Sequence, residues 1–279
     1  MNLASANPTS AAVLALAFIA GCGAHAAVPP TTTAASRHAY ANVHGLSMYY
    51  EVHGAGRPLV LLHGGVSTID NSFGQVIPVF ARTHTVIAIE QQGHGHTADI
   101  DRPLSYEQMA EDTNALLGQL GVTSADFLGW SDGGLVALRV AMKHPERVRR
   151  VVLLSSGYDN ENQDVGAIKE MTPEMVPPGF HDAYSKVAPD PSHWPAFIQK
   201  TKGLALNFKG WSADEVRAVE APALVMLGDH DIYTTEYALR MSRLLLHAQL
   251  AVLPGSDHFA IHRHPDWIVA MAGAFLDSP

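Results

Sequence analysis

A serine between two glycines is the first feature of the sequence that could do chemistry. It lies in the pentapeptide at positions 129–133, Gly-Trp-Ser-Asp-Gly, with Ser131 at its centre. In the G-x-S-x-G pattern the serine sits on a strained turn from a strand into a helix, and its neighbours must be small to avoid clashes. That context is present, because residues 126–128 predict a strand and residues from 133 onward predict a helix. The pattern favours a nucleophilic Ser131 over a serine in an ordinary turn.

A serine nucleophile needs a histidine base, which an acidic side chain must orient. In strand–turn–helix enzymes of this kind the acid and then the histidine follow the serine along the chain. Residues 224–227 predict a strand that enters an acidic turn with Asp229 and Asp231, and residues 249–253 predict one that leads to His258. Open α/β sheets build their sites at these carboxyl ends of strands. The sequence therefore predicts a triad, and Asp159 is a further candidate for the acid.

A glycine-rich turn follows the predicted strand that ends at residue 62. Its sequence at 63–66 is His-Gly-Gly-Val, and such a turn can aim a backbone N–H at a developing oxyanion. The second donor would be the N–H of Asp132, beside the nucleophile. Trp130, on the other side of Ser131, is a candidate for the wall of a substrate pocket.

Taken together, these motifs resemble those of the α/β-hydrolase superfamily, from about His44 to the C-terminus. The motifs are His-Gly-Gly at 63–65, Gly-His-Gly at 93–95, the serine pentapeptide at 129–133, Gly-Asp-His-Asp at 228–231 and Gly-Ser-Asp-His at 255–258. The resemblance implies Ser131 as nucleophile, Asp231 as acid and His258 as base. It also implies an oxyanion hole from the backbone of Gly65 (or Val66) and Asp132.

One segment departs from the pattern of that superfamily. Residues 90–97 read Glu-Gln-Gln-Gly-His-Gly-His-Thr in place of a common Asp-x-Arg-Gly-x-Gly-x-Ser. Gln92 therefore stands where an arginine often lies. The difference concerns a structural polar network rather than the triad.

The sixteen histidines of the chain raise the question of a metal site. His94 with His96, and His262 with His264, are spaced so that each pair could share a strand face. Two ligands do not make a closed tetrahedral zinc site, and neither a cysteine nor a carboxylate cluster completes either pair. We expect polar loop residues there, a structural His63, and neither a metal nor a cofactor.

Short apolar runs alternate with longer helical patterns, which indicates an α/β fold with a mostly parallel sheet flanked by helices. Strands are predicted at 46–52, 59–62, 85–89, 126–128, 150–154, 223–227 and 249–253, and helices at 105–120, 133–143, 234–246 and 265–276. Ser105, followed three residues later by Gln108, gives the helix at 105–120 a capping signature.

A stretch rich in proline interrupts this alternation at about 157–219, and it is too long for a plain loop. We interpret it as a small helical cap inserted between two strands. Six aromatic residues of the cap could line an apolar pocket, although most of them should pack the cap onto the main domain: Phe180, Tyr184, Trp194, Phe197, Phe208 and Trp211.

The N-terminus carries features of an export signal. The apolar run at 11–20 is half of the roughly 20 residues that a membrane helix needs, which is typical of a signal peptide. Residues 19–22, Ile-Ala-Gly-Cys, resemble the lipobox of bacterial lipoproteins with Cys22 as the lipidated residue, and residues 24–26, Ala-His-Ala, offer an ordinary cleavage site. The absence of Lys and Arg from residues 1–10 counts against both of these interpretations, and the alternative is an alanine-rich tail or a misassigned start codon.

These features predict a signal peptide or lipobox at 1–22, a flexible linker at 23–37 and a folded domain at 38–279. We expect an exported protein, either periplasmic or anchored to a membrane through Cys22, with secretion as the second choice. The formal charge of −9 argues against a nucleic-acid partner, because it leaves no basic surface for phosphates. A single cysteine excludes an intramolecular disulfide.

The motifs predict an enzyme that hydrolyses a carboxylic ester or lactone of small size through an acyl-serine intermediate. A C–C bond hydrolase, an amidase or a perhydrolase with the same triad, and a non-catalytic ligand receptor, remain alternatives. The haloalkane dehalogenases and epoxide hydrolases of the superfamily use aspartate as the nucleophile, so Ser131 disfavours those activities. The assignment to esters rests partly on family analogy.

Overall fold

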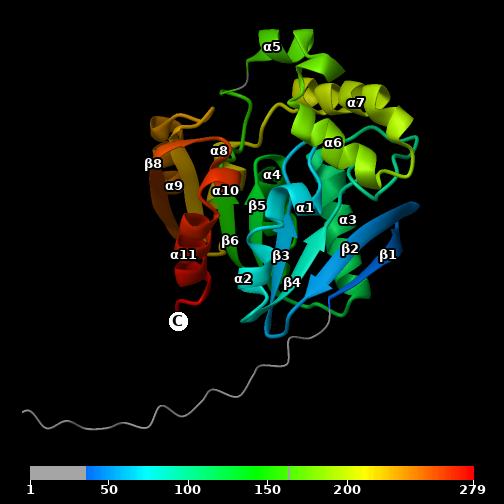
Figure 1. The fold of residues 1–279 in the computed structure, drawn as a ribbon. Coiled ribbons are helices and arrows are strands. Elements are labelled where there is room, and N and C mark those ends of the chain that lie inside the picture. The colour runs from blue at the N-terminus through cyan, green and yellow to red at the C-terminus, as the bar shows by residue number, and fades with distance from the viewer. Residues whose placement is uncertain (1–35, 163) are drawn as a thin grey trace, which may run out of the picture. The chain divides into compact units, whose positions relative to one another are not determined.

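The computed structural model describes residues 36–162 and 164–279, and its centre is one eight-stranded sheet (Figure 1). The strand order is β1-β2-β4-β3-β5-β6-β7-β8. The strands are β1 (Arg37–Val43), β2 (Leu46–His53), β3 (Arg57–Leu62), β4 (His84–Ile89), β5 (Ala125–Trp130), β6 (Val148–Leu154), β7 (Ala223–His230) and β8 (Ala248–Asp257). β1 and β2 pair antiparallel, β2 pairs antiparallel with β4, and every later pairing is parallel. This confirms the predicted fold class.

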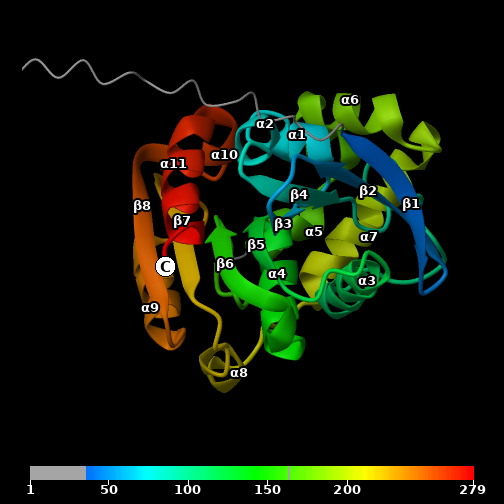
Figure 2. The same cartoon turned by 90° about the horizontal axis from the view of Figure 1, so that it is seen from below.

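Helices cover both faces of the sheet (Figure 2). On one face lie α3 (Tyr106–Gln119), α4 (Asp132–Lys143) and α9 (Thr235–Leu244), and on the other lie α1 (Ile69–Phe73), α2 (Ile77–Phe80), α10 (Ala260–Arg263) and α11 (Pro265–Leu276). Each face has its own apolar core, and alternate residues of the strands point into one or the other. That is why the central strands read as continuous apolar runs in the sequence.

The segment between β6 and β7 is helical, and its larger helices lie beyond the carboxyl ends of the parallel strands (Figure 1). It contains α5 (Val165–Glu170), η2 (Pro173–Met175), α6 (Pro178–Val187), η3 (Pro191–His193), α7 (Trp194–Asn207) and α8 (Ala213–Arg217). Several of these short helices begin at a proline, whose fixed φ angle suits the first turn and whose missing N–H costs nothing there.

Some local elements differ from the sequence prediction. The sequence prediction lacks strand β1, whose first residue falls within the predicted linker, and it also lacks the short helices α1, α2 and α10. Helices of four or five residues show too few turns for a helical period to be visible. The N-terminal capping of helix α3 agrees with the prediction in part. Ser105 Oγ accepts from the Gln108 N–H, but the Gln108 side chain donates to Asp112 and does not return to the Ser105 backbone.

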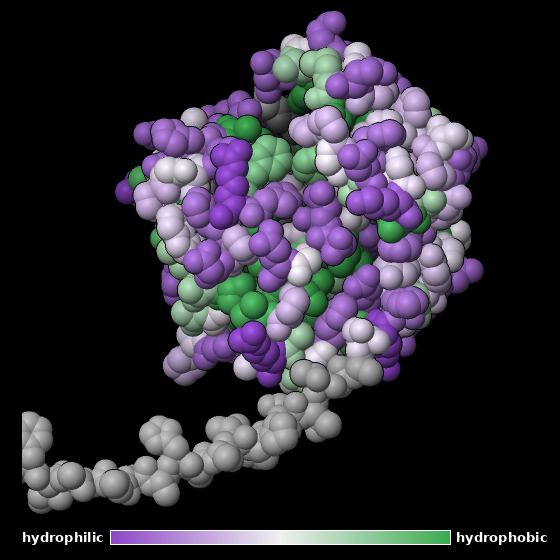
Figure 3. Space-filling model, in the orientation of Figure 1, coloured by the Kyte–Doolittle hydropathy of each residue, from purple (hydrophilic) through white to green (hydrophobic). Residues whose placement is uncertain are grey.

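The predicted signal peptide, lipobox with Cys22 and nearly all of the linker at 23–37 lie outside the described residues, so they stay predictions. Within the described residues, none of the helices has the length and apolar character needed to cross a membrane. The face of the molecule in Figure 3 is mostly hydrophilic, with apolar residues gathered in a few separate areas.

Candidate active site

Ser131 occupies a strained turn between β5 and α4. Its φ angle of 54° lies in the left-handed region, which is rare for any residue other than glycine, and its N–H donates to Leu154 O at 2.9 Å. The flanking glycines are needed for close approach: a Cβ on Gly129 would lie 2.2 Å from the Gly133 carbonyl oxygen, and one on Gly133 only 1.9 Å from that of Leu62. The glycines therefore allow α4 to start against the sheet.

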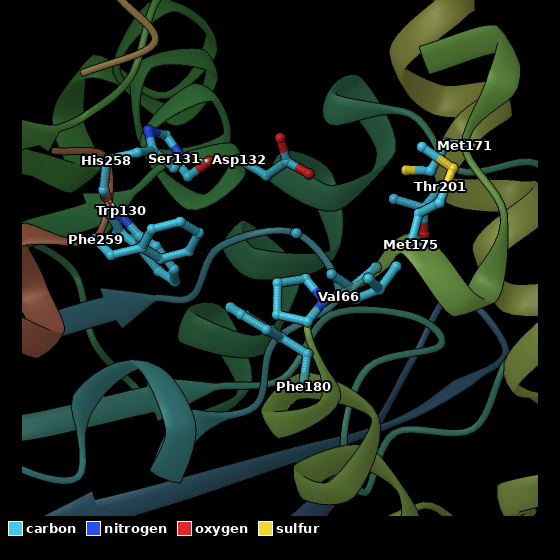
Figure 4. Close-up of a pocket in the computed structure, with 13 residues that line it drawn as sticks. Val66, Trp130, Ser131, Asp132, Met171, Met175, Phe180, Thr201, His258 and Phe259 are labelled. Carbon is cyan, nitrogen blue, oxygen red and sulfur yellow. Dashed lines mark hydrogen bonds between the residues drawn. The ribbon is translucent and has the colours of Figure 1, made fainter. Parts of the chain in front are cut away.

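The structure brings the predicted serine, acid and histidine into one hydrogen-bonded row. Ser131 Oγ lies 3.0 Å from His258 Nε2 (Figure 4), and His258 Nδ1 lies 2.9 Å from Asp231 Oδ1. Asp231 follows β7 and His258 follows β8, and these strands pair in parallel, so their carboxyl ends meet. A neutral His258 with its proton on Nδ1 donates to Asp231 and accepts from the Ser131 hydroxyl. That is the protonation state a general base requires.

Asp231 is held ionised although its side chain is fully buried. Burial alone would raise the pKa of Asp231, but hydrogen bonds and charge attraction from His258, with donors at Ser155 and Tyr233, lower it below the ordinary value. The Ser155 hydroxyl and Asp231 Oδ2 are both buried, and neither forms a hydrogen bond of ordinary geometry among the described residues, so the influence of Ser155 on Asp231 is that of a weak contact. A carboxylate is therefore available to stabilise a protonated His258.

The two alternative acids point elsewhere. Asp229 Oδ1 accepts from the Ser256 N–H at 3.0 Å, so it joins the end of β7 to β8. Asp159 Oδ1 accepts from the Tyr237 hydroxyl at 3.1 Å and from the Glu161 N–H at 3.0 Å. Neither carboxylate bonds to His258.

The backbone donors of an oxyanion hole are placed beside Ser131, with one correction to the prediction. The Val66 N–H already donates to His94 Nε2 at 3.2 Å, so Val66 is not available as a donor. The N–H groups of Gly65 and Asp132 have no acceptor within residues 36–162 and 164–279. Asp132 is also the first residue of α4, where the helix dipole favours negative charge. Gly65 and Asp132 are therefore the pair that can bind an oxyanion.

A cavity of about 270 Å³ opens onto Ser131 and His258. Trp130 lines it as predicted, although this side chain is almost fully buried and its Nε1–H donates to His258 O at 3.0 Å. Of the six aromatic residues of the cap only Phe180 reaches the cavity; the other five pack among themselves and against the main domain. The remaining apolar wall comes from residues that the sequence did not single out: Met171, Met175, Val176, Pro177 and Phe259.

The Asp132 side chain is the main polar group of the cavity apart from Ser131 and His258 (Figure 4). Its Oδ1 accepts from the Tyr106 hydroxyl at 2.8 Å. Its Oδ2 lies close to Gly65, where an added Cβ would approach it to 2.5 Å. Loss of water around it raises the pKa of Asp132, against the opposite effects of Tyr106 and His258. An acid that protonates readily thus adjoins the oxyanion hole.

The other histidines and Gln92 take part in contacts between loops. His96 Nδ1 bonds to the buried Glu90 carboxylate at 2.9 Å, and His262 Nε2 lies 3.1 Å from Asn71 O. The Gln92 amide joins Asp99 to Arg102, and Arg102 in turn donates to Asp112, so Gln92 belongs to a structural polar network. In the part of the chain that the structure describes, no three histidine, cysteine or acidic side chains are placed to share a metal ion.

A family model described as alpha/beta hydrolase fold matches residues 57–189. The 2-hydroxymuconate semialdehyde hydrolase of Pseudomonas sp. (strain CF600) is 28% identical over 261 residues, which cover 80% of this chain and 88% of that protein. The non-heme haloperoxidase of Rhodococcus erythropolis is 26% identical over 271 residues, covering 84% and 97% of the two chains.

Among solved structures, an N-acyl homoserine lactone degrading enzyme superposes with a TM-score of 0.69 at 25% identity, covering 85% of this chain and 99% of that one. These likenesses extend over most of the described residues and agree with the topology of the sheet. The chain is therefore a hydrolase of the α/β-hydrolase superfamily.

Proposed function

We propose that the protein hydrolyses carboxylic esters or lactones through an acyl-serine intermediate, with Ser131 as nucleophile, His258 as base and Asp231 as the acid that orients it. The observation that carries the proposal is the row of hydrogen bonds from Ser131 Oγ through His258 to Asp231, at 3.0 and 2.9 Å. A row of this geometry activates a hydroxyl group that is otherwise a poor nucleophile.

In the first half of the reaction Ser131 Oγ attacks the carbonyl carbon while His258 Nε2 takes the hydroxyl proton. The carbonyl oxygen becomes negative and is bound by the N–H groups of Gly65 and Asp132. His258 then gives its proton to the leaving alcohol as the C–O bond breaks. In the second half His258 deprotonates a water molecule, which attacks the acyl-serine. His258 then returns the proton to Ser131 Oγ as the acyl–oxygen bond breaks, and the carboxylic acid is released.

Two features support a small apolar acyl group as the preferred substrate. The cavity of about 270 Å³ is slightly smaller than the roughly 300–1,000 Å³ usual for ligand sites, and its wall is mainly Met, Val, Pro and Phe side chains. The likeness to an N-acyl homoserine lactone degrading enzyme favours lactones among the possible esters.

A C–C bond hydrolase is the second candidate. It is favoured by the similarity to a 2-hydroxymuconate semialdehyde hydrolase over 88% of that protein. The same nucleophile and oxyanion hole would act on a ketone, and the leaving group would then be a carbon atom that must be protonated. The carboxyl group of Asp132 is the acid of the cavity nearest the oxyanion hole.

The experiment that tests the proposal is hydrolysis of p-nitrophenyl esters from acetate to long acyl chains, with γ- and δ-lactones and a vinylogous diketone measured in parallel. Wild type is compared with Ser131→Ala. We expect ester or lactone turnover with a preference for short chains, and a fall to background in the variant.

Turnover of the diketone alone, abolished by Ser131→Ala, would replace the ester assignment by C–C hydrolysis. Ester turnover that survives Ser131→Ala would contradict the triad. If wild type turns over none of these compounds but binds them, a ligand receptor becomes the better interpretation.

A further inference from the structure

His94 is a buried histidine that the proposed reaction does not use, yet it bonds to the turn that carries an oxyanion donor. This turn, residues 63–66, is called the oxyanion turn below. His94 Nε2 lies 3.2 Å from the Val66 nitrogen, and His94 Nδ1 lies 3.0 Å from the Gln92 carbonyl oxygen. The Gly-His-Gly motif at 93–95 thus contacts the residue next to Gly65.

The partners of His94 leave only one protonation state. A carbonyl oxygen can only accept, so Nδ1 must carry the proton; a backbone N–H can only donate, so Nε2 must be bare. Both conditions hold only in the neutral ring. Burial, and then the neighbouring His63, lower the pKa of His94 well below its ordinary value, while Asp99 acts in the opposite direction. Asp99 is itself paired with Lys200 and His193.

The hydrogen bond from the Val66 N–H to His94 stabilises a strained part of the backbone. Val66 has a φ angle of 53°, a conformation that strains a β-branched residue and persists only when the surroundings enforce it. Two further hydrogen bonds, from the Gln91 N–H to His63 Nε2 and from the Ile69 N–H to Glu90, hold residues before and after Val66. His94 is the partner that holds Val66 itself.

The His94 ring is in turn fixed by its packing. Its centroid lies 4.6 Å from that of His63 and 4.7 Å from that of Phe197, which belongs to α7 of the cap. A ring clamped between the main domain and the cap can define the position of the Val66 N–H. The contact between Phe197 and His94 therefore links the cap to the oxyanion turn.

We propose that His94 is a positioning residue for the reaction: its bare Nε2 holds the Val66 N–H and thereby aims the adjacent Gly65 N–H at the oxyanion. The inference rests on the proposed function, because it assumes that Gly65 binds an oxyanion during acyl transfer to Ser131. It assigns a role to the Gly-His-Gly motif that requires no metal.

Two substitutions separate the acceptor from the rest of the side chain. In His94→Gln the amide oxygen can reach the place of Nε2 and accept from Val66. In His94→Asn the shorter amide reaches only the place of Nδ1, and in His94→Phe the ring packing stays without any acceptor. His247→Asn, at an exposed site remote from the cavity, is the matched control.

We expect kcat for a p-nitrophenyl ester to fall roughly 10- to 100-fold in His94→Asn and His94→Phe, somewhat less than the loss of a whole oxyanion donor. KM should change less than about threefold, and His94→Gln should recover kcat to within about fivefold of wild type. The rate at which a p-nitrophenyl phosphonate modifies Ser131 should fall in parallel, since its P=O oxygen uses the same hole. Circular dichroism and the thermal midpoint verify that each variant is folded.

Wild-type kcat and phosphonate reactivity in folded His94→Asn and His94→Phe would overturn the proposal, as would a loss in His94→Gln equal to that in His94→Asn. Nitrogen NMR of ¹⁵N-histidine-labelled wild type gives a test independent of folding of the variants: a proton on Nε2 of His94 would exclude the acceptor role. Failure of the phosphonate to modify wild-type Ser131 would instead refute the proposed function.

Discussion

Two aspartates only two residues apart have different environments at the end of β7. Asp231 is fully buried against His258, whereas Asp229 is partly exposed and bonds to the backbone of Ser256. The difference arises at the bulge between Gly228 and His230, after which the Asp231 N–H turns back to Gly228 O at 3.3 Å. The chain leaves the strand at this point, so the two side chains no longer share a face.

Substitution of these aspartates should therefore have unequal effects. We expect Asp231→Asn to lower kcat by about 10⁴, because an amide cannot hold the required His258 tautomer or stabilise its protonated form. Asp229→Asn should lower it less than about threefold. Steady-state kinetics on one p-nitrophenyl ester measures both, and equal losses in the two variants would show that the acid has been misassigned.

Asp132 presents a carboxyl group to the oxyanion hole, so its ionisation should matter for catalysis. Because the pKa of Asp132 is raised, the neutral acid persists to higher pH than for an ordinary aspartate, and the carboxylate forms above that raised pKa. A carboxylate beside the hole opposes the developing negative charge, and in this partly buried site the opposition is worth about tenfold in rate.

We expect kcat for a neutral ester to decline by about that factor as pH rises through the pKa of Asp132. Asp132→Asn keeps the backbone donor and should remove the decline, because the amide does not ionise. The pH–rate profiles of the two proteins decide this. A decline that persists in Asp132→Asn would assign it to another group.

Gly133 in helix α4 and Gly203 in helix α7 have opposite consequences for stability. Gly133 in α4 has no room for a side chain, since a Cβ would lie 1.9 Å from the Leu62 carbonyl oxygen of β3. Gly203 in α7 has nothing within 4 Å of such a Cβ. The first glycine permits contact between helix and sheet, and the second only weakens a helix.

Gly133→Ala should lower the free energy of unfolding by about 3 kcal/mol, because strand and helix must move apart to relieve the overlap. Gly203→Ala should raise it by about 0.5–1 kcal/mol through helix propensity. Urea denaturation of both variants and wild type gives these values. A neutral Gly133→Ala would mean that α4 can shift without cost.

At the scale of the whole molecule, folding buries His63 and His94 as neutral rings between loops and cap. Burial lowers the pKa of both below the value of 6.5 that they have when unfolded. The unfolded chain therefore binds protons to these residues before the folded one does. Their contribution to stability is complete above pH 6.5 and is lost as pH falls from 6.5 toward the lower folded pKa.

We expect the free energy of unfolding to fall with decreasing pH between about 6.5 and 5, by up to about 1.4 kcal/mol per pH unit for each buried ring. His94→Gln removes one titrating group and should reduce the slope, whereas exposed His247→Gln should not. His96, whose pKa is raised by its bond to Glu90, acts in the opposite sense and is common to all three proteins. Identical slopes in His94→Gln and wild type would refute the assignment.

The alternation of the longer strands and helices, and Ser131 and His258 as candidate site residues, could be inferred from the sequence alone. Each depends on local patterns: an apolar run of strand length, a small-residue turn, and a polar residue just after it. Parallel strands place their carboxyl ends at one edge of the sheet, so residues distant in the chain could be predicted to meet there.

Only the tertiary structure decided which of two neighbouring residues acts as the oxyanion donor, and which residues form the wall of the cavity. In the sequence, Gly65 and Val66 are both possible oxyanion donors. In the structure the Val66 N–H donates to His94, which lies 28 residues further along the chain, so Gly65 is the donor that remains. Met171 and Val176 line the same cavity as Ser131 because the cap folds back over the sheet, and no periodicity predicts that placement. These contacts depend on packing between segments that are distant in the chain. Sequence patterns indicate only the local structure of a segment and of the residues next to it.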